Sequence, residues 1–357
     1  MLVRGVAGVV YNEKIYFSSE YPVGCLFCFD IKKETTRFVK QFSVDKNQGM
    51  CHRGAQLYHN TAWFIPWDGC RVVCVELDSM EERYFDILNH HYANGHAFAD
   101  YIVYKENELV LIPSGMKLTT LMIINMKTQQ VQCYPDVIPD CQCIGAYIWR
   151  DLLHFISSDG KVLSEFDLNE RKLKMKNTGE KSESGDYASL LRHGEWICLI
   201  PYDGSDVTLI HLKTERRETI PLPDPQDAFW SGCVIKDGIL LFPGNYNSHF
   251  FRINLFSKKG TIIEWSKEQE SDHWVCIKEI FSSDKEHLAI GTDGAVYQLN
   301  EEGALMKKWN YKREVEERLK IPKMDVRMME EHFLQYSPIN ESPELQLADL
   351  ISVVLGK

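Results

Sequence analysis

The sequence predicts an all-β protein, a seven-bladed β-propeller with a helical C-terminal tail. Two observations predict this fold class. Short apolar runs recur along the chain at a near-constant step, and each recurring unit carries the same order of strand and turn signals. We expect the propeller to occupy residues 1–310 and the helical C-terminal extension to occupy residues 311–357.

The recurring run is a short apolar segment that often ends in proline or a small residue, as in Phe64-Ile65-Pro66. Its equivalent positions in the seven units are Phe17, Phe64, Leu111, Phe155, Leu199, Leu241 and Ala289. Consecutive positions are 42 to 48 residues apart. Since a four-stranded propeller blade takes about 40–50 residues, these positions predict seven blades with the marked residues buried in equivalent strands.

Within each unit, a small residue opens an apolar first strand, and the marked run forms the second strand. A turn follows, often with Asp-Gly, and the third strand is expected to alternate between apolar and polar residues, as in CLFCFDIK from Cys25. A shorter polar strand ends the unit. The last unit contains its own fourth strand near residues 304–309. We therefore expect the ring to close by packing between the first and last blades, without a swapped strand.

The chain beyond Trp309 changes in character. Ser342-Pro343-Glu344 has the residues of a helix N-terminus: a capping serine, a first-turn proline and an early acid. An apolar stripe at helical spacing follows, formed by Leu347, Leu350, Ile351 and Val354. This helix is expected to bury its stripe against the propeller or against a partner protein.

Composition limits the partners and the compartment. The 357-residue chain has a formal net charge of −11, which disfavours nucleic acid and anionic membrane surfaces as partners. No run reaches the roughly 20 apolar residues of a membrane span, and the N-terminus has no clear leader segment. The 11 cysteines are odd in number and several lie in apolar runs. We therefore expect free thiols in a reducing cytoplasm.

In period and strand order, residues 3–310 resemble the WD40-like and kelch-like β-propeller repeat superfamily. The recurrent Gly-His and Trp-Asp pairs of WD40 repeats and the Gly-Gly dipeptide of kelch repeats do not recur here. The resemblance implies the architecture and carries over no functional residue.

In propellers, the start of each inner strand and the loop between the second and third strands open on one face, around the channel. At these places the sequence has aromatic, histidine and arginine residues, which can grip a polar ligand by stacking and hydrogen bonds. The candidate ligand-binding residues are His52, Arg53, Trp67, His96, Tyr187, Tyr202, Trp230 and Trp274. The same residues can instead pack and cap the top of the blades.

We expect a non-catalytic binding or scaffolding propeller whose partner is a protein, a peptide or a glycan. The alternative is a propeller enzyme, a lyase or hydrolase acting on a small polar or cyclic substrate, with His52, His96 or His273 as acid or base. The sequence contains no nucleophile elbow, phosphate-binding loop or dinucleotide fingerprint. It therefore designates no catalytic residue.

No metal and no cofactor are expected. His90, His91 and His96 form the densest histidine group, but their spacing matches no strong metal motif. Cys25 and Cys28 lie three apart in a strand and should point to opposite faces. The acids of the Asp-Gly turns are expected mainly to satisfy turn backbone groups.

Overall fold

The structure is a computed structural model. It describes residues 4–21, 24–42, 51–68, 71–86, 97–115, 118–177, 187–201, 206–223, 228–245, 249–264, 275–283 and 285–311. Every regular element in these ranges is a β-strand. None of the described residues belongs to a helix long and apolar enough to cross a membrane. The predicted helical tail lies outside the described residues.

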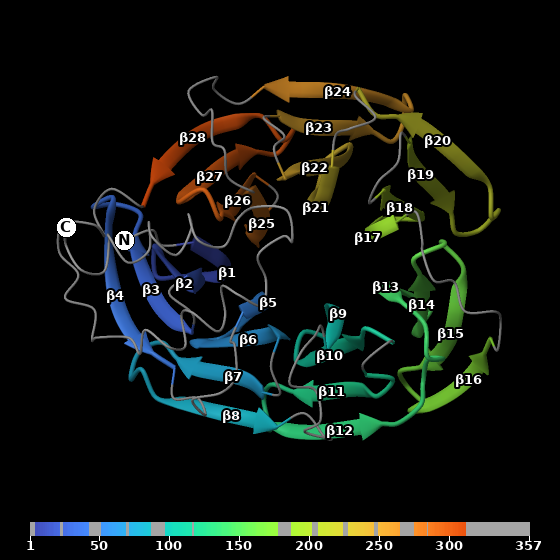
Figure 1. Ribbon diagram of the computed structural model, residues 1–357, viewed down its shortest axis with the longest axis horizontal. Helices are drawn as coiled ribbons and strands as arrows, with labels where there is room; N and C mark the ends of the chain where they lie inside the picture. The colour runs from blue at the N-terminus through green and yellow to red at the C-terminus, as the bar shows by residue number, and fades with distance from the viewer. Residues whose placement is uncertain are drawn as a thin grey trace, which may run out of the picture.

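The strands form seven antiparallel blades of four, each built from consecutive strands (Figure 1). The inner strands are β1 (Arg4–Tyr11), β5 (Cys51–Tyr58), β9 (Phe98–Tyr104), β13 (Cys143–Trp149), β17 (Tyr187–His193), β21 (Ala228–Ile235) and β25 (Val275–Ser282). The second strands are β2 (Lys14–Tyr21), β6 (Thr61–Asp68), β10 (Glu108–Pro113), β14 (Leu152–Ser157), β18 (Trp196–Pro201), β22 (Gly238–Asn245) and β26 (Glu286–Gly291).

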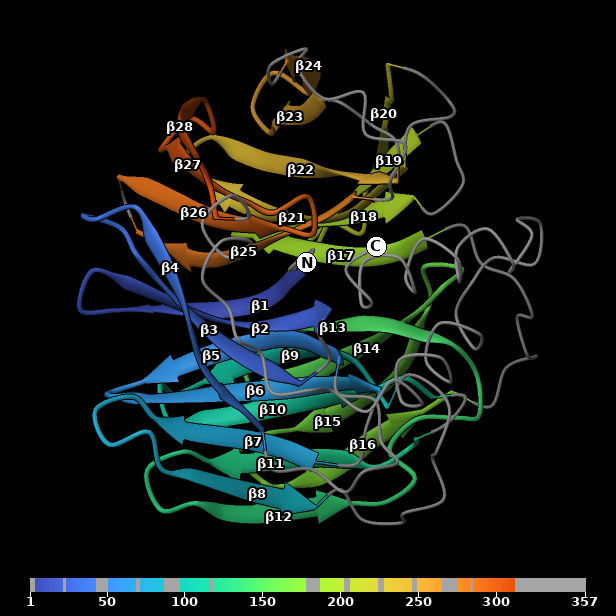
Figure 2. The same cartoon turned by 60° about the vertical axis from the view of Figure 1, so that its left-hand side comes forward.

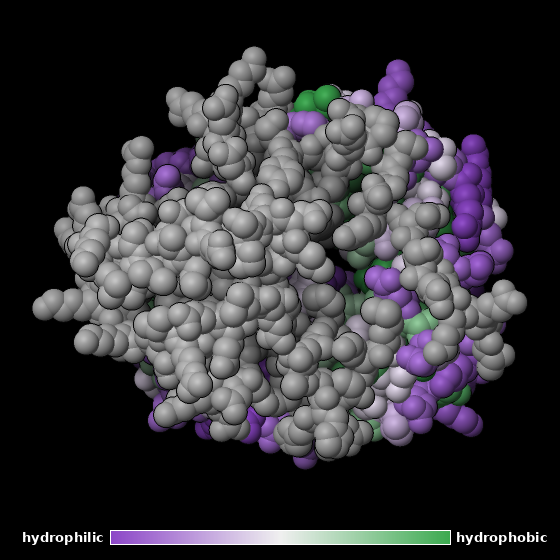
Figure 3. Space-filling model, in the orientation of Figure 1, coloured by the Kyte–Doolittle hydropathy of each residue, from purple (hydrophilic) through white to green (hydrophobic). Residues whose placement is uncertain are grey.

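The third strands are β3 (Cys25–Asp30), β7 (Arg71–Glu76), β11 (Leu121–Asn125), β15 (Val162–Asp167), β19 (Asp206–His211), β23 (His249–Asn254) and β27 (Ala295–Asn300). The outer strands are β4 (Thr35–Gln41), β8 (Glu82–Asp86), β12 (Gln130–Tyr134), β16 (Lys172–Lys176), β20 (Arg217–Pro221), β24 (Lys259–Glu264) and β28 (Leu305–Asn310). The outer strands lie at the rim in Figure 1, and Figure 3 shows hydrophilic residues along the right-hand rim, where β16 and β20 lie.

The predicted equivalence of the seven marked positions is confirmed. Each is the fourth residue of the second strand of its blade, counted from the hairpin that joins the inner and second strands. All seven side chains are fully buried. The recurring run therefore marks the strand that is enclosed most completely by its own sheet and by the neighbouring blades.

Seven hydrophobic clusters hold the blades together, one at each interface between neighbouring blades. Adjacent residues of one strand supply different clusters: Phe64 packs towards the first blade, whereas Trp63 and Ile65 pack towards the third. Both faces of the second and third strands are thus buried, because a blade has a neighbour on each side. For this reason the predicted alternation of the third strands is wrong for β3, β7 and β11, where four or five consecutive residues are buried. It is retained in part in β15, β23 and β27, where a half-buried residue lies between buried ones.

The ring closes as predicted, without a swapped strand. The last blade consists of β25 to β28, and β1 lies beside β25 (Figures 1 and 2). Tyr311 seals this interface: its hydroxyl accepts a hydrogen bond from the Gly5 amide at 2.7 Å and donates one to the Gly291 carbonyl at 2.8 Å. Its ring lies 4.8 Å from that of Phe17.

Candidate functional site

The register of the inner strands creates one recurring irregularity near the start of the strand. In six blades, one residue of the inner strand has no partner in the second strand. In blade 2, for example, Gly54 pairs with Ile65, and Arg53 just before Gly54 is skipped. The other five blades skip the equivalent residue. The skipped residues are Val6, Arg53, Ala99, Ile144, Ala188 and Trp230. Such bulges re-aim side chains. Two of the predicted ligand-binding residues, Arg53 and Trp230, therefore occupy the same position in blades 2 and 6.

The next residue of the inner strand is small in five of the seven blades. These residues are Ala7, Gly54, Gly145, Ser189 and Ser231. The two exceptions are charged: Asp100 in the third blade and Lys278 in the seventh. A Cβ atom added at Gly145 would lie 3.4 Å from an Asp100 carboxylate oxygen. The small residues at this position in the other five blades therefore leave room for the side chains of Asp100 and Lys278.

Two cations and one aromatic ring form a cluster near the starts of the inner strands. The guanidinium carbon of Arg53 lies 4.5 Å from the centre of the Trp67 ring, and the Lys278 Nζ atom lies 4.9 Å from the same ring. Lys278 Nζ also donates a hydrogen bond of 2.5 Å to the Arg53 carbonyl oxygen. Lys278 belongs to blade 7 and Arg53 to blade 2, so the cluster joins two blades that are not neighbours. We call Arg53, Trp67 and Lys278 the axial cluster.

Asp100 balances part of the positive charge of the axial cluster. Burial raises the pKa of the Asp100 carboxyl, and the nearby charges of Arg53 and Lys278 oppose that rise. The neighbouring Tyr101 donates a hydrogen bond of 3.0 Å from its hydroxyl to the Ala55 carbonyl. The charges of Asp100 and Glu279 both act on Tyr101, so the two cations of the axial cluster have carboxylates close by among the described residues.

His52 lies away from the axial cluster. The residue is 1 % exposed, and its ring packs against Phe42 and Phe64, with ring centres 5.4 and 5.3 Å away. Neither ring nitrogen has a hydrogen-bond partner among the described residues. Burial lowers the pKa of His52 to about 3, so the ring is neutral at physiological pH. These contacts give His52 a packing role between the first two blades.

Tyr187 is also held between blades. Its hydroxyl lies 2.8 Å from the Thr208 hydroxyl of its own blade, and its ring faces Gly160 of the preceding blade. Of the eight predicted residues, the structure brings together Arg53 and Trp67 and places His52 and Tyr187 elsewhere. His96, Tyr202, Trp274 and the Trp230 side chain lie outside the described residues.

Sequence reasoning missed Lys278 and Asp100. Asp100 is the one charged residue of the inner strand FADYIVY, and Lys278 stands beside Glu279 in the inner strand VCIKEIFS. A charge in such a strand was the available signal, because an inner strand has few places other than the axis where an ionised side chain is tolerated.

The turn acids that the structure describes have the expected backbone role. Asp159 accepts a hydrogen bond from the Lys161 amide at 3.4 Å, and Asp293 accepts one from the Ala295 amide at 3.3 Å. The side chains of Cys25 and Cys28 enter different inter-blade clusters, so the prediction that they face opposite ways is confirmed. The eight cysteines whose side chains are described are all free thiols.

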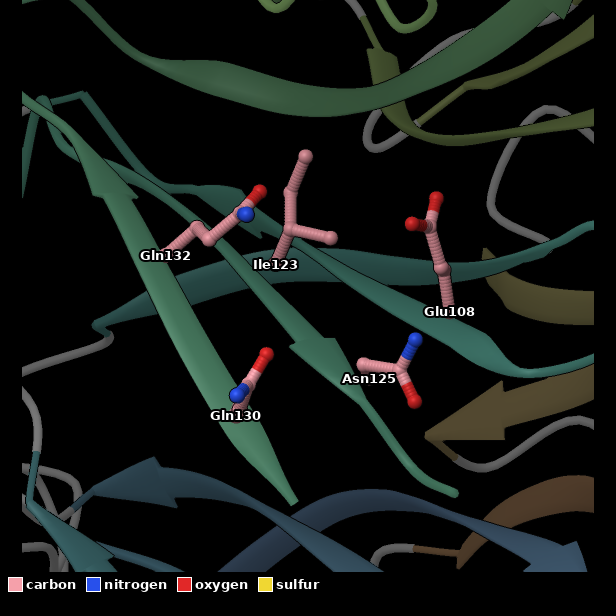
Figure 4. A pocket seen from close by; sticks show the side chains of 5 residues that line it. All are labelled: Glu108, Ile123, Asn125, Gln130 and Gln132. Atoms are coloured by element: carbon pink, nitrogen blue, oxygen red, sulfur yellow. The ribbon is translucent and has the colours of Figure 1, made fainter. Parts of the chain in front are cut away.

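A polar pocket on the third blade lies away from the axis. Glu108, Ile123, Asn125, Gln130 and Gln132 line it, from β10, β11 and β12 (Figure 4). The guanidinium of Arg171, from the fourth blade, forms an ion pair with Glu108. The pocket is therefore part of a polar contact between blades.

Comparisons with known proteins establish the architecture. No protein-family model matches the chain, and no curated protein matches its sequence. Among solved structures, it is similar to virginiamycin B lyase from Staphylococcus aureus, with a TM-score of 0.51 and 10 % identity over 78 % of this chain and 86 % of that one. It is also similar to Hsv2 from Kluyveromyces lactis, with a TM-score of 0.50 and 8 % identity over 87 % and 99 % of the two chains.

A third similar structure is PorZ of the type-IX secretion system of Porphyromonas gingivalis. The TM-score is 0.55 and the identity 11 %, over 86 % of this chain and 38 % of that one. At such low identities these likenesses carry the fold alone. The chain is thus a seven-bladed β-propeller, in agreement with the predicted propeller resemblance.

Proposed function

We propose that this protein is a non-catalytic binding or scaffolding propeller that binds a peptide, protein or glycan ligand on its channel-mouth face. The observation that carries the proposal is the axial cluster, in which Arg53 and Lys278 share the ring of Trp67. An indole ring supplies contact area at low conformational cost, and two cations supply direction. We therefore propose that the ligand presents an anionic group to Arg53 and Lys278.

The enzyme alternative receives no comparable support. Of the three histidines considered as acid or base, only His52 is described, and its ring is buried among phenyl groups with a depressed pKa. A general acid must hold a proton near neutral pH and reach its substrate. The free thiols of the described cysteines also support our proposal that the protein works in the reducing cytoplasm.

The test starts from affinity capture of the full chain followed by mass spectrometry, in parallel with a synthetic peptide array that pairs each glutamate-rich peptide with its glutamine counterpart. Binding is then measured for Arg53→Ala and Trp67→Ala. We expect each variant to lose at least about tenfold in affinity, roughly 1.4 kcal/mol, with an unchanged melting curve.

The chain offers a matched control. The exposed Arg150 lies 5.6 Å from the Trp149 ring in a hairpin turn at the other end of an inner strand. Arg150→Asn suits the positive φ of 52° at that position and should bind like the parent. If Arg53→Ala and Trp67→Ala both bind like the parent, the ligand site lies elsewhere on the propeller. Equal capture of glutamate and glutamine peptides would rule out recognition of an anionic group.

A further inference from the structure

A second group of reactive side chains lies at the interface between the sixth and seventh blades, apart from the axial cluster. It consists of Cys233 from β21, Glu279 from β25 and His287 from β26, and their donor atoms all lie within 4.8 Å of one another. The Nδ1 atom of His287 is 2.8 Å from a Glu279 carboxylate oxygen. The Cys233 thiol lies beside the same carboxylate, and burial together with that carboxylate raises the pKa of the thiol. These three residues are called the blade 6–7 trio below.

Strand pairing in the seventh blade explains why Glu279 points at this interface. Glu279 pairs with the marked residue, Ala289, as the equivalent residue of every other inner strand pairs with its own marked residue. In the other six blades that equivalent residue is uncharged. Directly opposite residues share a face of the sheet, and His287 shares that face because it is two residues from Ala289. Cys233 and Ala289 belong to the same inter-blade cluster.

The small side chain at Ala289 provides the room. The other six marked positions carry phenylalanine or leucine, which would fill the space beside the paired residue of the inner strand. In the seventh blade this space receives a carboxylate and an imidazole instead. The side chain of His287 is 4 % exposed and that of Glu279 is 26 % exposed, so the trio is enclosed on the histidine side and open to solvent on the glutamate side.

The donor set fits a divalent transition-metal ion. Zinc is bound in proteins by thiolate, imidazole and carboxylate at about 2.0–2.3 Å, which places tetrahedral ligand atoms within about 4 Å of one another. Small side-chain movements would bring the trio to that spacing. A thiolate and a carboxylate would also neutralise the two positive charges of the ion, which matters at an interface that is largely apolar.

We propose that Cys233, Glu279 and His287 bind one Zn²⁺ ion, or a similar borderline transition-metal ion, between the sixth and seventh blades. Binding of the ion forms a Zn–S bond, releases the thiol proton of Cys233 to water, and takes one ligand from blade 6 and two from blade 7. The fourth position is left for water, and the Ser282 hydroxyl lies close by, 3.0 Å from His287 Nδ1. The ion joins the two blades, so its binding stabilises the folded propeller.

The experiment uses the untagged full chain, stripped with a chelator and titrated with Zn²⁺ and Co²⁺. We expect one ion per chain by elemental analysis and a rise in the melting temperature with added Zn²⁺. Bound Co²⁺ should show a thiolate-to-metal charge-transfer absorption in the near ultraviolet. Cys233→Ser should abolish that absorption, and both Cys233→Ser and His287→Asn should weaken Zn²⁺ binding by more than about 100-fold, beyond the usual cost of losing an outer-shell partner.

Cys198→Ser is the matched control, because Cys198 is a fully buried thiol of the fifth blade outside the trio. It should bind both ions like the parent. If His287→Asn fails to fold, Glu279→Gln, which keeps the shape of the side chain, serves in its place and should bind Zn²⁺ weakly. The proposal is overturned if the parent takes up no stoichiometric ion, or if Cys233→Ser binds Co²⁺ with an unchanged spectrum.

Discussion

The imidazole of His52 packs between Phe42 and Phe64 as a phenyl ring would, and Arg53, the next residue, lies against Trp67 of the axial cluster. The two neighbours in sequence have unrelated environments, because Arg53 is the skipped residue of a bulge in β5, and a bulge re-aims its side chain. His52 faces the dry interface between blades 1 and 2. At the residue scale, the direction of a side chain decides whether a polar group can meet a ligand.

The burial of His52 makes stability depend on pH. Its folded-state pKa is lowered to about 3, against about 6.5 for an ordinary histidine. Below pH 6.5 the unfolded chain takes up a proton that the folded chain excludes, so stability is full above that value and falls towards pH 3. At pH 5 this single group costs about 2 kcal/mol.

His52→Leu removes that titration. Between pH 7.5 and pH 5, urea unfolding should show the parent losing about 2 kcal/mol more stability than the variant. His211→Leu, at a partly exposed histidine of β19, is the control for loss of a histidine. Parallel pH profiles for the parent and His52→Leu would show that His52 does not carry this dependence.

At the element scale, the inner strands β5 and β9 approach each other through a glycine. A Cβ atom added at Gly54 would lie 2.3 Å from Cε1 of Tyr101, too close without a shift of that ring. The Tyr101 hydroxyl is anchored on the Ala55 carbonyl, so the ring cannot move away without losing a hydrogen bond. The glycine that opens the repeat in this blade thus permits close packing with the next blade.

Gly54→Ala should therefore destabilise the protein by about 1–3 kcal/mol, the usual cost of overpacking. Combining it with Tyr101→Leu, which removes the obstructing ring, should make the alanine nearly neutral. The free energies of unfolding of the two single variants and the double variant form a cycle that isolates the contact. Strictly additive effects would mean that Gly54 is required for another reason.

At the scale of the whole molecule, closure of the ring depends on Tyr311, which follows the last strand. Its hydroxyl accepts a hydrogen bond from the Gly5 amide and donates one to the Gly291 carbonyl, so this side chain joins the first and seventh blades. A Cβ atom at Gly5 would lie 2.6 Å from Ile290 and 2.8 Å from this hydroxyl. Only glycine fits there without rearrangement.

Tyr311→Phe keeps the ring and leaves a buried amide and carbonyl without this partner. We expect a loss of about 1–3 kcal/mol in the free energy of unfolding. Tyr134→Phe is the control, since the Tyr134 hydroxyl bonds the exposed Gln132 side chain, and it should change stability by less than about 0.5 kcal/mol. Equal effects of the two substitutions would contradict a closing role for Tyr311.

The tail remains a prediction from the sequence. Deleting residues 342–357 removes the expected helix and its apolar stripe, so it should lower the melting temperature or abolish a pull-down, depending on whether the stripe covers the propeller or a partner. Replacing Leu347 and Leu350 by serine in the full-length chain should have the same effect as the deletion. If the protein without residues 342–357 matches the parent in both assays, the tail neither stabilises the propeller nor binds the partner.

The amino-acid sequence alone determined the blade number, the equivalent buried positions and the closure without a swapped strand. These follow from local signals, since each blade repeats one pattern of apolar runs and turns that recurs at positions such as Phe17 and Phe64. It also placed Arg53 and Trp67 on one face. It misjudged third strands such as β3, because burial on both sides by neighbouring blades removes the alternation expected of a half-exposed strand.

Only the tertiary structure decided which candidate residues meet. Lys278 joins Arg53 from 225 residues away, and Cys233 meets His287 across a blade interface. Such meetings depend on where each inner strand places its bulge and on which neighbours are small, as at Gly54 and Ala289. A shift of one residue in register turns a side chain to the other face, and the spacing of repeats along a chain does not contain that information.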